Sequence, residues 1–517
     1  MMRGVSRLIL LALTVSTLLA AAPAGRGGDW EVSTPEEQGL DSAHLVHFLR
    51  EARELDLHEV IVVRNGRLVL DVPFYPFRSG VVHALHSVTK SVVSVLIGIA
   101  IDEGAIAGVG APLVEFFPDR EVIRRETGDG SKGEPGEVIT LEHVLAMTSG
   151  FEWAETSLPY ADSRNMATRM MRSGDWVAFA LQRPRRHDPG TVFNYNSGGS
   201  HLLVAVLRNA TREEPLAFAR KHLFEPLGIS AVHWMGDPSG LPSGGNGLFM
   251  LPRDLAKIGW LYLQAGEWEG RQIVSADWTQ ASTRPRVATD NLLFPAFGYH
   301  WWVGEDGSFA GMGLGGQFLF VVPHRRMVVV VTAGVPPAAV GEIPALVRRS
   351  ILPAALGEDP LPANREAMEA LRAEVEAAAL SPDPEPLKVL PGRAKEIGGK
   401  RYLLEENPWG WKSLAIEFAE AEARVTLEIG TGFLVQPVGL DGVYRITEGG
   451  PHTILGSPLA ARGEWEDEHT FVWCQQGLHR AESWEHRYSF ARGTVAIEVH
   501  ERLEGATLLE TRGRSER

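Results

Sequence analysis

The stretch that decides the fold is His86-Ser-Val-Thr-Lys-Ser-Val-Val-Ser-Val-Leu-Ile-Gly-Ile-Ala-Ile101. No charged residue follows Lys90 until Asp102, so we expect a largely buried helix. Ser87 and Lys90 lie one helical turn apart, on the same face. Burying an ammonium group is costly unless the group is paired or used, and the positive end of the helix dipole lowers the pKa of a lysine. A serine beside a partly neutral lysine is a nucleophile with its own base, so this stretch predicts a catalytic pair.

A second informative segment is Asp188-Pro-Gly-Thr-Val-Phe-Asn-Tyr-Asn-Ser-Gly-Gly-Ser200. Its Pro-Gly pair predicts a turn, and a helix is expected to begin near Gly199. Tyr195 stands between the turn and the helix. A tyrosine beside a cation can pass a proton to a leaving group, whereas a tyrosine in a polar turn, taken alone, is more often structural.

Together these segments carry a family resemblance. Ser87-Val-Thr-Lys90, Leu145-Ala-Met-Thr-Ser-Gly150 and Pro189-Gly-Thr-Val-Phe-Asn-Tyr-Asn-Ser197 resemble the penicillin-recognising serine hydrolases, a superfamily of class C β-lactamases, penicillin-binding-protein-like peptidases and esterases. The residues of these motifs are most similar to those of the β-lactamase-related serine hydrolases. The resemblance implies an α/β (α+β) fold, with a β-lactamase/transpeptidase-like antiparallel sheet flanked by helices. It also implies Ser87 as the acylated nucleophile, Lys90 as its base partner and Tyr195 as the proton shuttle.

The sequence departs from the family pattern in two places. Two residues after the tyrosine the family has asparagine, whereas this chain has Ser197, with Asn196 beside it. The third family motif begins with lysine or histidine, and the matching stretch here, Gly313-Leu-Gly-Gly-Gln317, begins with glycine. We expect the N–H of Gly316 to join that of Ser87 in an oxyanion hole. Gln317, Asn196 and Ser197 are the further candidates for substrate binding.

The chain divides into several parts. Two strand pairs, residues 59–70 around Asn65-Gly66 and residues 317–331, bracket a helical middle. We expect a serine hydrolase domain over residues 30–355, a connecting helix and proline-rich linker over 356–390, and an all-β domain over 391–512. The alternating apolar pattern after the linker predicts the strands of this last domain, which resembles lipocalin-like domains. Its tryptophans are expected to pack the domain core.

Composition narrows the class of protein. Of the 517 residues, 44% are hydrophobic and 22% are charged, which is typical of globular proteins. The net charge of −15 argues against a nucleic-acid partner, and the single cysteine excludes a cysteine-built zinc site. Residues 1–24 combine a basic start, a short apolar run and an Ala-rich end, as a signal peptide does. The run is too short to span a bilayer, which needs about 20 residues, so no stable membrane insertion is expected after cleavage.

These observations predict an exported, periplasmic or extracellular serine hydrolase that cleaves a small ester or amide through an acyl-enzyme on Ser87. No metal or cofactor is implied. Within enzymes, the alternative is a D-alanyl-D-alanine peptidase or a β-lactamase. In another class, the alternative is a non-catalytic protein that binds cell-wall peptides. The oligomeric state is left open.

Overall fold

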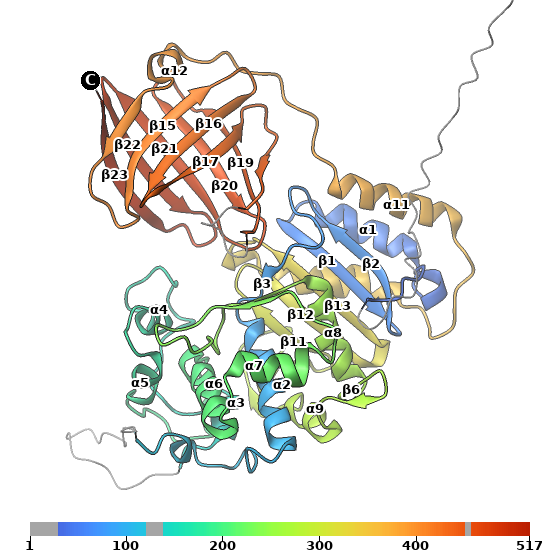
Figure 1. Cartoon of the computed structure of the whole chain (residues 1–517). Helices are drawn as coiled ribbons and strands as arrows, with labels where there is room; N and C mark the ends of the chain where they lie inside the picture. The colour runs from blue at the N-terminus through green and yellow to red at the C-terminus, as the bar shows by residue number, and fades with distance from the viewer. Residues whose placement is uncertain (1–28, 120–137, 450–455, 517) are drawn as a thin grey trace, which may run out of the picture.

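The structure is a computed structural model that describes residues 29–119, 138–449 and 456–516. The expected signal peptide, residues 1–24, lies outside the described residues. Within the described ranges, the first part of the chain is built on an eight-stranded antiparallel sheet (Figure 1). In sheet order the strands are β2 (Arg67–Pro73), β1 (Leu57–Arg64), β13 (Met327–Ala333), β12 (Gln317–Val322), β11 (Phe309–Gly313), β10 (Trp302–Val303), β9 (Ala296–Phe297) and β8 (Val287–Ala288).

Both strand pairs predicted from the sequence are antiparallel hairpins of this sheet. Asn65 and Gly66 connect β1 to β2 with φ values of 49° and 76°, the left-handed region that such a tight turn requires. A short 3-10 turn, Pro323–Arg325, connects β12 to β13. Since β1 pairs directly with β13, the two hairpins are adjacent in space although far apart in the sequence.

Side chains alternate between the two faces of the sheet, and each face has its own apolar core. Ile61 and Val63 pack into the core that α2 (Val88–Asp102), α6 (Ser197–Thr211) and α8 (Pro252–Leu263) complete. Val60 and Val62 pack into the opposite core with α1 (Ser42–Ala52) and α11 (Arg365–Ala379). The sheet therefore lies between two helical layers, with the larger layer on the α2 side.

Shorter elements complete the first part of the chain. The connecting helix predicted from the sequence is α11, which packs on α1. Glu374 of α11 accepts hydrogen bonds from Arg50 Nε at 2.7 Å and from Arg53 Nη2 at 2.6 Å. Within the described residues, the helices are too short or too polar to cross a membrane. The other elements are α3 (Leu141–Leu145), α4 (Met166–Met171), α5 (Trp176–Leu181), α7 (Pro215–Ala219), α9 (Ala276–Ser282), α10 (Glu342–Leu346), and the small sheet β3 (His83–Ala84), β5 (Leu248–Met250) and β4 (Val232–Trp234), beside the minor pair β6 (Glu267–Trp268) and β7 (Arg271–Gln272).

The last part of the chain is an all-β barrel that follows α12 (Gly392–Ile397) (Figure 1). Neighbouring strands pair antiparallel, and a parallel contact between Gly439 and Arg462 joins β17 to β19 and closes the barrel. Trp473 and Tyr488 are buried in its core, as expected of the aromatic residues of this region. Within the described residues the strands are β14 (Arg401–Leu404), β15 (Trp411–Phe418), β16 (Glu422–Ile429), β17 (Gly432–Gly439), β18 (Arg445–Thr447), β19 (Leu459–Trp465), β20 (Thr470–Gly477), β21 (Ser483–Ala491), β22 (Thr494–Glu501) and β23 (Thr507–Ser515).

Candidate active site

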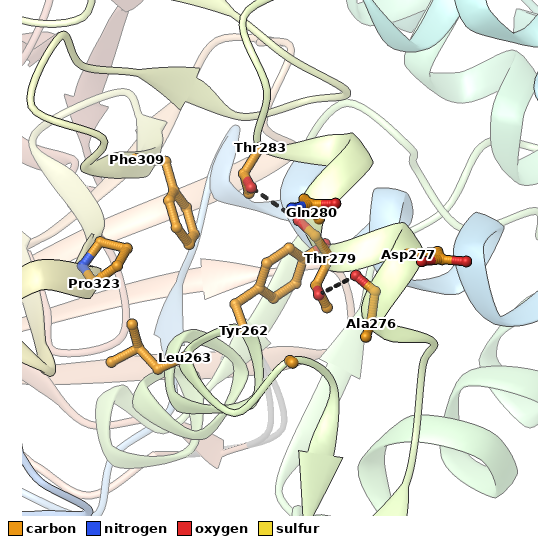
Figure 2. A pocket seen from close by; sticks show the side chains of 10 residues that line it. Tyr262, Leu263, Ala276, Asp277, Thr279, Gln280, Thr283, Phe309 and Pro323 are labelled. Carbon is orange, nitrogen blue, oxygen red and sulfur yellow. Dashed lines mark hydrogen bonds between the residues drawn. The ribbon is translucent and has the colours of Figure 1, made fainter.

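Two places on the first part of the chain are candidates for an active site, and one of them has no serine–lysine pair. A pocket of about 340 Å³ lies between α8 and α9, and Figure 2 shows Tyr262, Thr279 and Phe309 around it. Phe309 begins β11, so this pocket adjoins the end of β11 opposite to Gly313. Its polar lining consists of hydroxyl, amide and carboxylate groups without a serine–lysine pair. We therefore place the candidate site at the start of α2.

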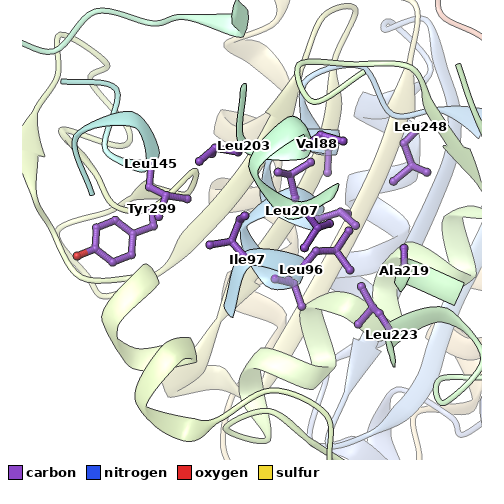
Figure 3. Packing of buried hydrophobic residues seen from close by; sticks show 14 of the residues in the cluster. Val88, Leu96, Ile97, Leu145, Leu203, Leu207, Ala219, Leu223, Leu248 and Tyr299 are labelled. Carbon is purple, nitrogen blue, oxygen red and sulfur yellow. The ribbon is translucent and has the colours of Figure 1, made fainter. Parts of the chain in front are cut away.

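Helix α2 holds that site rigidly, because it is buried on all sides. Val88, Leu96 and Ile97 pack among leucines of α6 and neighbouring elements (Figure 3), and each of the three is 0% exposed. Ser87 is the N-cap residue, yet its side chain makes no capping hydrogen bond. Its hydroxyl is thus left for the site, where Ser87 is partly exposed and Lys90 is buried.

The residue before the serine has an unusual backbone. His86 has a φ of 45°, in the left-handed region, which costs a non-glycine residue on the order of 1–3 kcal/mol. The β11 strand passes close by, since a Cβ added to Gly313 would lie 2.6 Å from Leu85 O and 3.1 Å from His86 Cβ. The nucleophile candidate is therefore presented on a sharp turn that packs against a glycine of the sheet.

The Lys90 ammonium group faces three acceptors. Lys90 Nζ lies 3.0 Å from Ser87 Oγ, 3.0 Å from Ser197 Oγ and 2.7 Å from the Gly245 carbonyl oxygen. Burial lowers the pKa of Lys90 to about 8, and the negative charge of Glu155 partly opposes this shift. A lysine with that pKa is neutral in a useful fraction of molecules near neutral pH, as a general base must be. The predicted proximity of Ser87 and Lys90 is thus present.

A buried carboxylate that the sequence did not reveal stands behind the lysine. Glu155 is 2% exposed, and it accepts hydrogen bonds from Ser197 Oγ at 2.5 Å and from Ser197 N at 2.9 Å. Trp153 Nε1 donates to it at 2.6 Å and the Tyr160 hydroxyl at 2.9 Å. Because Ser197 Oγ donates to Glu155, its lone pair is free to accept from Lys90. The one signal in the sequence is the replacement of the family asparagine by Ser197, from which no carboxylate partner was inferred.

Tyr195 closes the site on the other side of Lys90. Lys90 Nζ lies 4.7 Å from the centre of the Tyr195 ring, which stacks on Trp302 with 6.2 Å between ring centres. Burial and the negative charge of Glu155 raise the pKa of Tyr195 far above its usual value, although a hydrogen bond with Ser87 acts in the opposite direction. The Tyr195 phenol is therefore protonated at neutral pH. The structure brings Ser87, Lys90 and Tyr195 together as expected.

Two of the other predicted residues, Gly316 and Gln317, stabilise the β11–β12 turn instead of lining the site. Gly316 N donates to Gly313 O at 3.2 Å within the β11–β12 turn, so this N–H is not available to an oxyanion. Gln317 is fully buried and its Nε2 donates to Ala333 O at 2.7 Å, which braces the same turn. Asn196 caps α6 by accepting the Gly199 N–H at 2.8 Å. The expectations for Gly316 and Gln317 are corrected accordingly, whereas Ser197 does contact Lys90.

His300 fixes the backbone of the lysine. Its Nδ1 lies 3.1 Å from Lys90 O and its Nε2 lies 3.3 Å from Ser200 Oγ. Burial lowers the pKa of His300 to about 3, and the nearby Lys90 charge adds to this, so the imidazole is neutral. Within the described residues, no cluster of three or more histidine, cysteine or carboxylate side chains is arranged to hold a metal ion.

Comparisons with known proteins show the family and the fold of this part of the chain. A family model described as Beta-lactamase matches residues 56–349. The 6-aminohexanoate-dimer hydrolase of Paenarthrobacter ureafaciens is 24% identical over 284 residues, which cover 52% of this chain and 70% of the relative. A solved Bacillus anthracis protein assigned to the 6-aminohexanoate-dimer hydrolases has a TM-score of 0.52 at 20% identity and covers 65% of this chain and 89% of its own. EstCE1, a hydrolase with promiscuous acyltransferase activity, has a TM-score of 0.50 at 16% identity. The match covers 61% of this chain and 99% of EstCE1. The predicted fold class is confirmed.

Proposed function

The chain belongs to the Beta-lactamase family, and from this premise we propose that it is an exported serine hydrolase that cleaves an ester or amide bond through an acyl-enzyme on Ser87. The observation that carries the proposal is the set of three contacts of Lys90 Nζ. Ser197 Oγ and the Gly245 carbonyl take two N–H groups of a neutral lysine. The lone pair of Nζ then faces the Ser87 hydroxyl, which is the arrangement that a general base requires.

The reaction follows from these positions. Ser87 Oγ attacks the substrate carbonyl carbon, and its proton moves to Lys90 Nζ. The tetrahedral intermediate collapses when the leaving group receives the Tyr195 hydroxyl proton, and Lys90 returns a proton to Tyr195. Water then attacks the acyl-enzyme and gives a proton to Lys90, and Lys90 passes this proton to Ser87 Oγ as the acid is released. Because its pKa is raised, Tyr195 acts as a donor that is re-protonated and not as a standing phenolate base.

The oxyanion needs two donors in this scheme. We assign them to the N–H of Ser87 and to a backbone N–H at the Met312–Gly313 end of β11, which passes beside His86. Gly313 permits this approach because a side chain there would collide with Leu85 O. This assignment replaces the expectation for Gly316.

The relatives support a small acyl substrate. The 6-aminohexanoate-dimer hydrolase acts on the dimer in its name, and EstCE1 is a hydrolase with acyltransferase activity. Export is proposed from the composition of residues 1–24. Expression in a bacterium followed by N-terminal sequencing of the periplasmic protein tests this; a mature chain that begins at Met1 would contradict it.

The decisive experiment is Ser87→Ala with a matched control. A fluorescent fluorophosphonate labels only a competent serine nucleophile, so we expect wild type to be labelled and Ser87→Ala to lose both labelling and ester turnover. Ser94→Ala makes the same change two turns further along α2, at a fully buried position outside the site, and should remain active. Wild-type turnover by Ser87→Ala would refute the proposal, as would a wild-type protein that binds cell-wall peptides without being labelled.

A further inference from the structure

The barrel reaches the segment that carries the proposed nucleophile. Its loop Leu478–Glu482 connects β20 to β21, and His479 O accepts a hydrogen bond of 2.8 Å from Ala84 N, in β3. Ala481 of the same loop packs on the β11–β12 turn, since a Cβ added to Gly315 would lie 2.5 Å from Ala481 Cβ. The loop thus touches both the strand that precedes Ser87 and the turn of the sheet that follows Gly313.

One charged side chain of this loop faces the residue next to the nucleophile. Glu482 Oε2 lies 3.7 Å from His86 Nε2 and 3.3 Å from Arg480 Nε. Burial acts to raise the pKa of Glu482, but His86 and Arg480 together outweigh burial and hold it below its usual value. Glu482 is therefore an ionised group that attracts the imidazole of His86, whose left-handed backbone sets the position of Ser87.

A second loop at the same end of the barrel contacts the other side of the site. Glu504, between β22 and β23, accepts a hydrogen bond of 3.2 Å from Tyr160 N. Tyr160 in turn donates to Glu155, which holds Ser197 against Lys90. Arg502 N donates to Ser483 O at 3.0 Å and ties the two barrel loops together.

Apolar packing fixes the barrel in this position. Phe77, Leu478 and Ala460 form a buried cluster across the two parts of the chain, and Tyr444 packs against it. The Tyr75 hydroxyl also accepts a hydrogen bond from Tyr444 N at 3.0 Å. A buried apolar contact gives a defined position that surface charges alone do not provide.

We propose that the barrel is a component of the active site and that Glu482 is a positioning residue, which holds His86 and thereby the Ser87 nucleophile in place. This inference rests on the proposed function. Glu482 does not touch the reacting atoms; it acts through His86. Removing it leaves the reaction chemistry intact but lets the nucleophile leave its productive position, which slows attack on the carbonyl carbon.

The test compares three variants of the full chain. Glu482→Ala removes the contact, and Glu482→Gln keeps the shape without the charge. Glu466→Gln is the matched control, because Glu466 is a barrel glutamate that also pairs with an arginine (Arg487 Nη2 to Glu466 Oε1, 3.0 Å) but lies beyond the opposite end of β20. Each protein is assayed for kcat and KM with a neutral ester, for the rate constant and end point of fluorophosphonate labelling, and for Tm.

We expect Glu482→Ala to lower kcat and the labelling rate constant by about tenfold, with KM, Tm and the labelling end point nearly unchanged. Glu482→Gln should show a smaller loss of the same kind, and Glu466→Gln none. Rates within about twofold of wild type in both Glu482 variants would overturn the inference, and so would a lower end point with an unchanged rate constant, which indicates misfolding alone. A wild-type protein that is not labelled would overturn the proposed function and this inference with it. If wild type is labelled and Ser87→Ala is not, the proposed function stands, and the Glu482 variants then test this inference alone.

Discussion

At the scale of single residues, the site depends on a lysine that is buried but not neutralised by a direct ion pair. Two acceptors orient its nitrogen, and the nearest carboxylate, Glu155, acts through Ser197. Burial lowers the pKa of Lys90 to about 8. Since the base must be neutral, about one-tenth of the molecules are competent at pH 7 and half at pH 8. We expect kcat/KM to rise with pH and to level off above an inflection near 8. A profile that is flat on both sides of this inflection would contradict Lys90 as the base.

Glu155 provides a sharper test of the same assignment. Its negative charge stabilises the protonated form of Lys90, so Glu155→Gln should lower the pKa of Lys90 and move the inflection to lower pH by roughly one unit. The variant should also lower Tm, because a buried carboxylate that accepts four hydrogen bonds is replaced by an amide that accepts fewer, at about 1–3 kcal/mol. Glu152→Gln, an exposed position in the same segment, is the control. An inflection at the same pH as in wild type would show that the charge of Glu155 does not influence the pKa of Lys90.

At the scale of elements, the glycine at the end of β11 is the reason why we expect carboxylate-bearing substrates to be disfavoured. A Cβ at Gly313 would lie 2.6 Å from Leu85 O, so the position at which the family resemblance implies a lysine or histidine carries no basic side chain here. Arg286 already pairs with Glu142, and Arg480 of the barrel faces Glu482. A missing charge-assisted hydrogen bond costs about 1.5–3 kcal/mol, or roughly 10- to 150-fold. We expect kcat/KM for a penicillin to be lower by that factor than for a neutral ester with a similar leaving group. Efficient penicillin turnover would show that another cation serves this purpose.

The elements also show how much of the fold and of the site could be predicted from the sequence. The helix after Ser87, the two hairpins and the strands of the barrel follow from local periodicity and turn residues, and the structure contains them. Gly316 and Gln317 were misassigned because a glycine-rich turn looks the same in sequence whether it lines a site or closes a hairpin. Glu155 was missed because the residue that joins it to Lys90 is Ser197, 42 residues along the chain, which only tertiary packing brings to it.

At the scale of the whole molecule, the barrel and the hydrolase unit are connected twice, by the chain and by contact. Residues 381–389 are exposed and form no helix or strand, so they contribute little to the association. The exposed pair of Arg78 and Glu448 adds little either, since such pairs contribute about 0–1 kcal/mol and are screened by salt. The apolar cluster around Phe77 and Leu478, with the hydrogen bond from Ala84 to His479, is the contact that holds the two parts together. The sequence does not predict this contact, because each of the two segments that form it has the pattern of an ordinary surface segment.

These two connections predict the result of cutting the linker. A specific protease site inserted after Ser381, within the exposed segment, allows the chain to be cut in the folded protein. We expect the two pieces to elute together at high and low salt and to keep the fluorophosphonate labelling rate of the uncut protein, because the contact survives the loss of the connection. Separating the pieces in denaturant and refolding the first alone should then lower its labelling rate, because His479 and Ala481 no longer support the segment around Ser87. Pieces that separate as soon as the linker is cut, or an isolated first piece that is labelled at the full rate, would show that the barrel is an independent module that only the linker attaches.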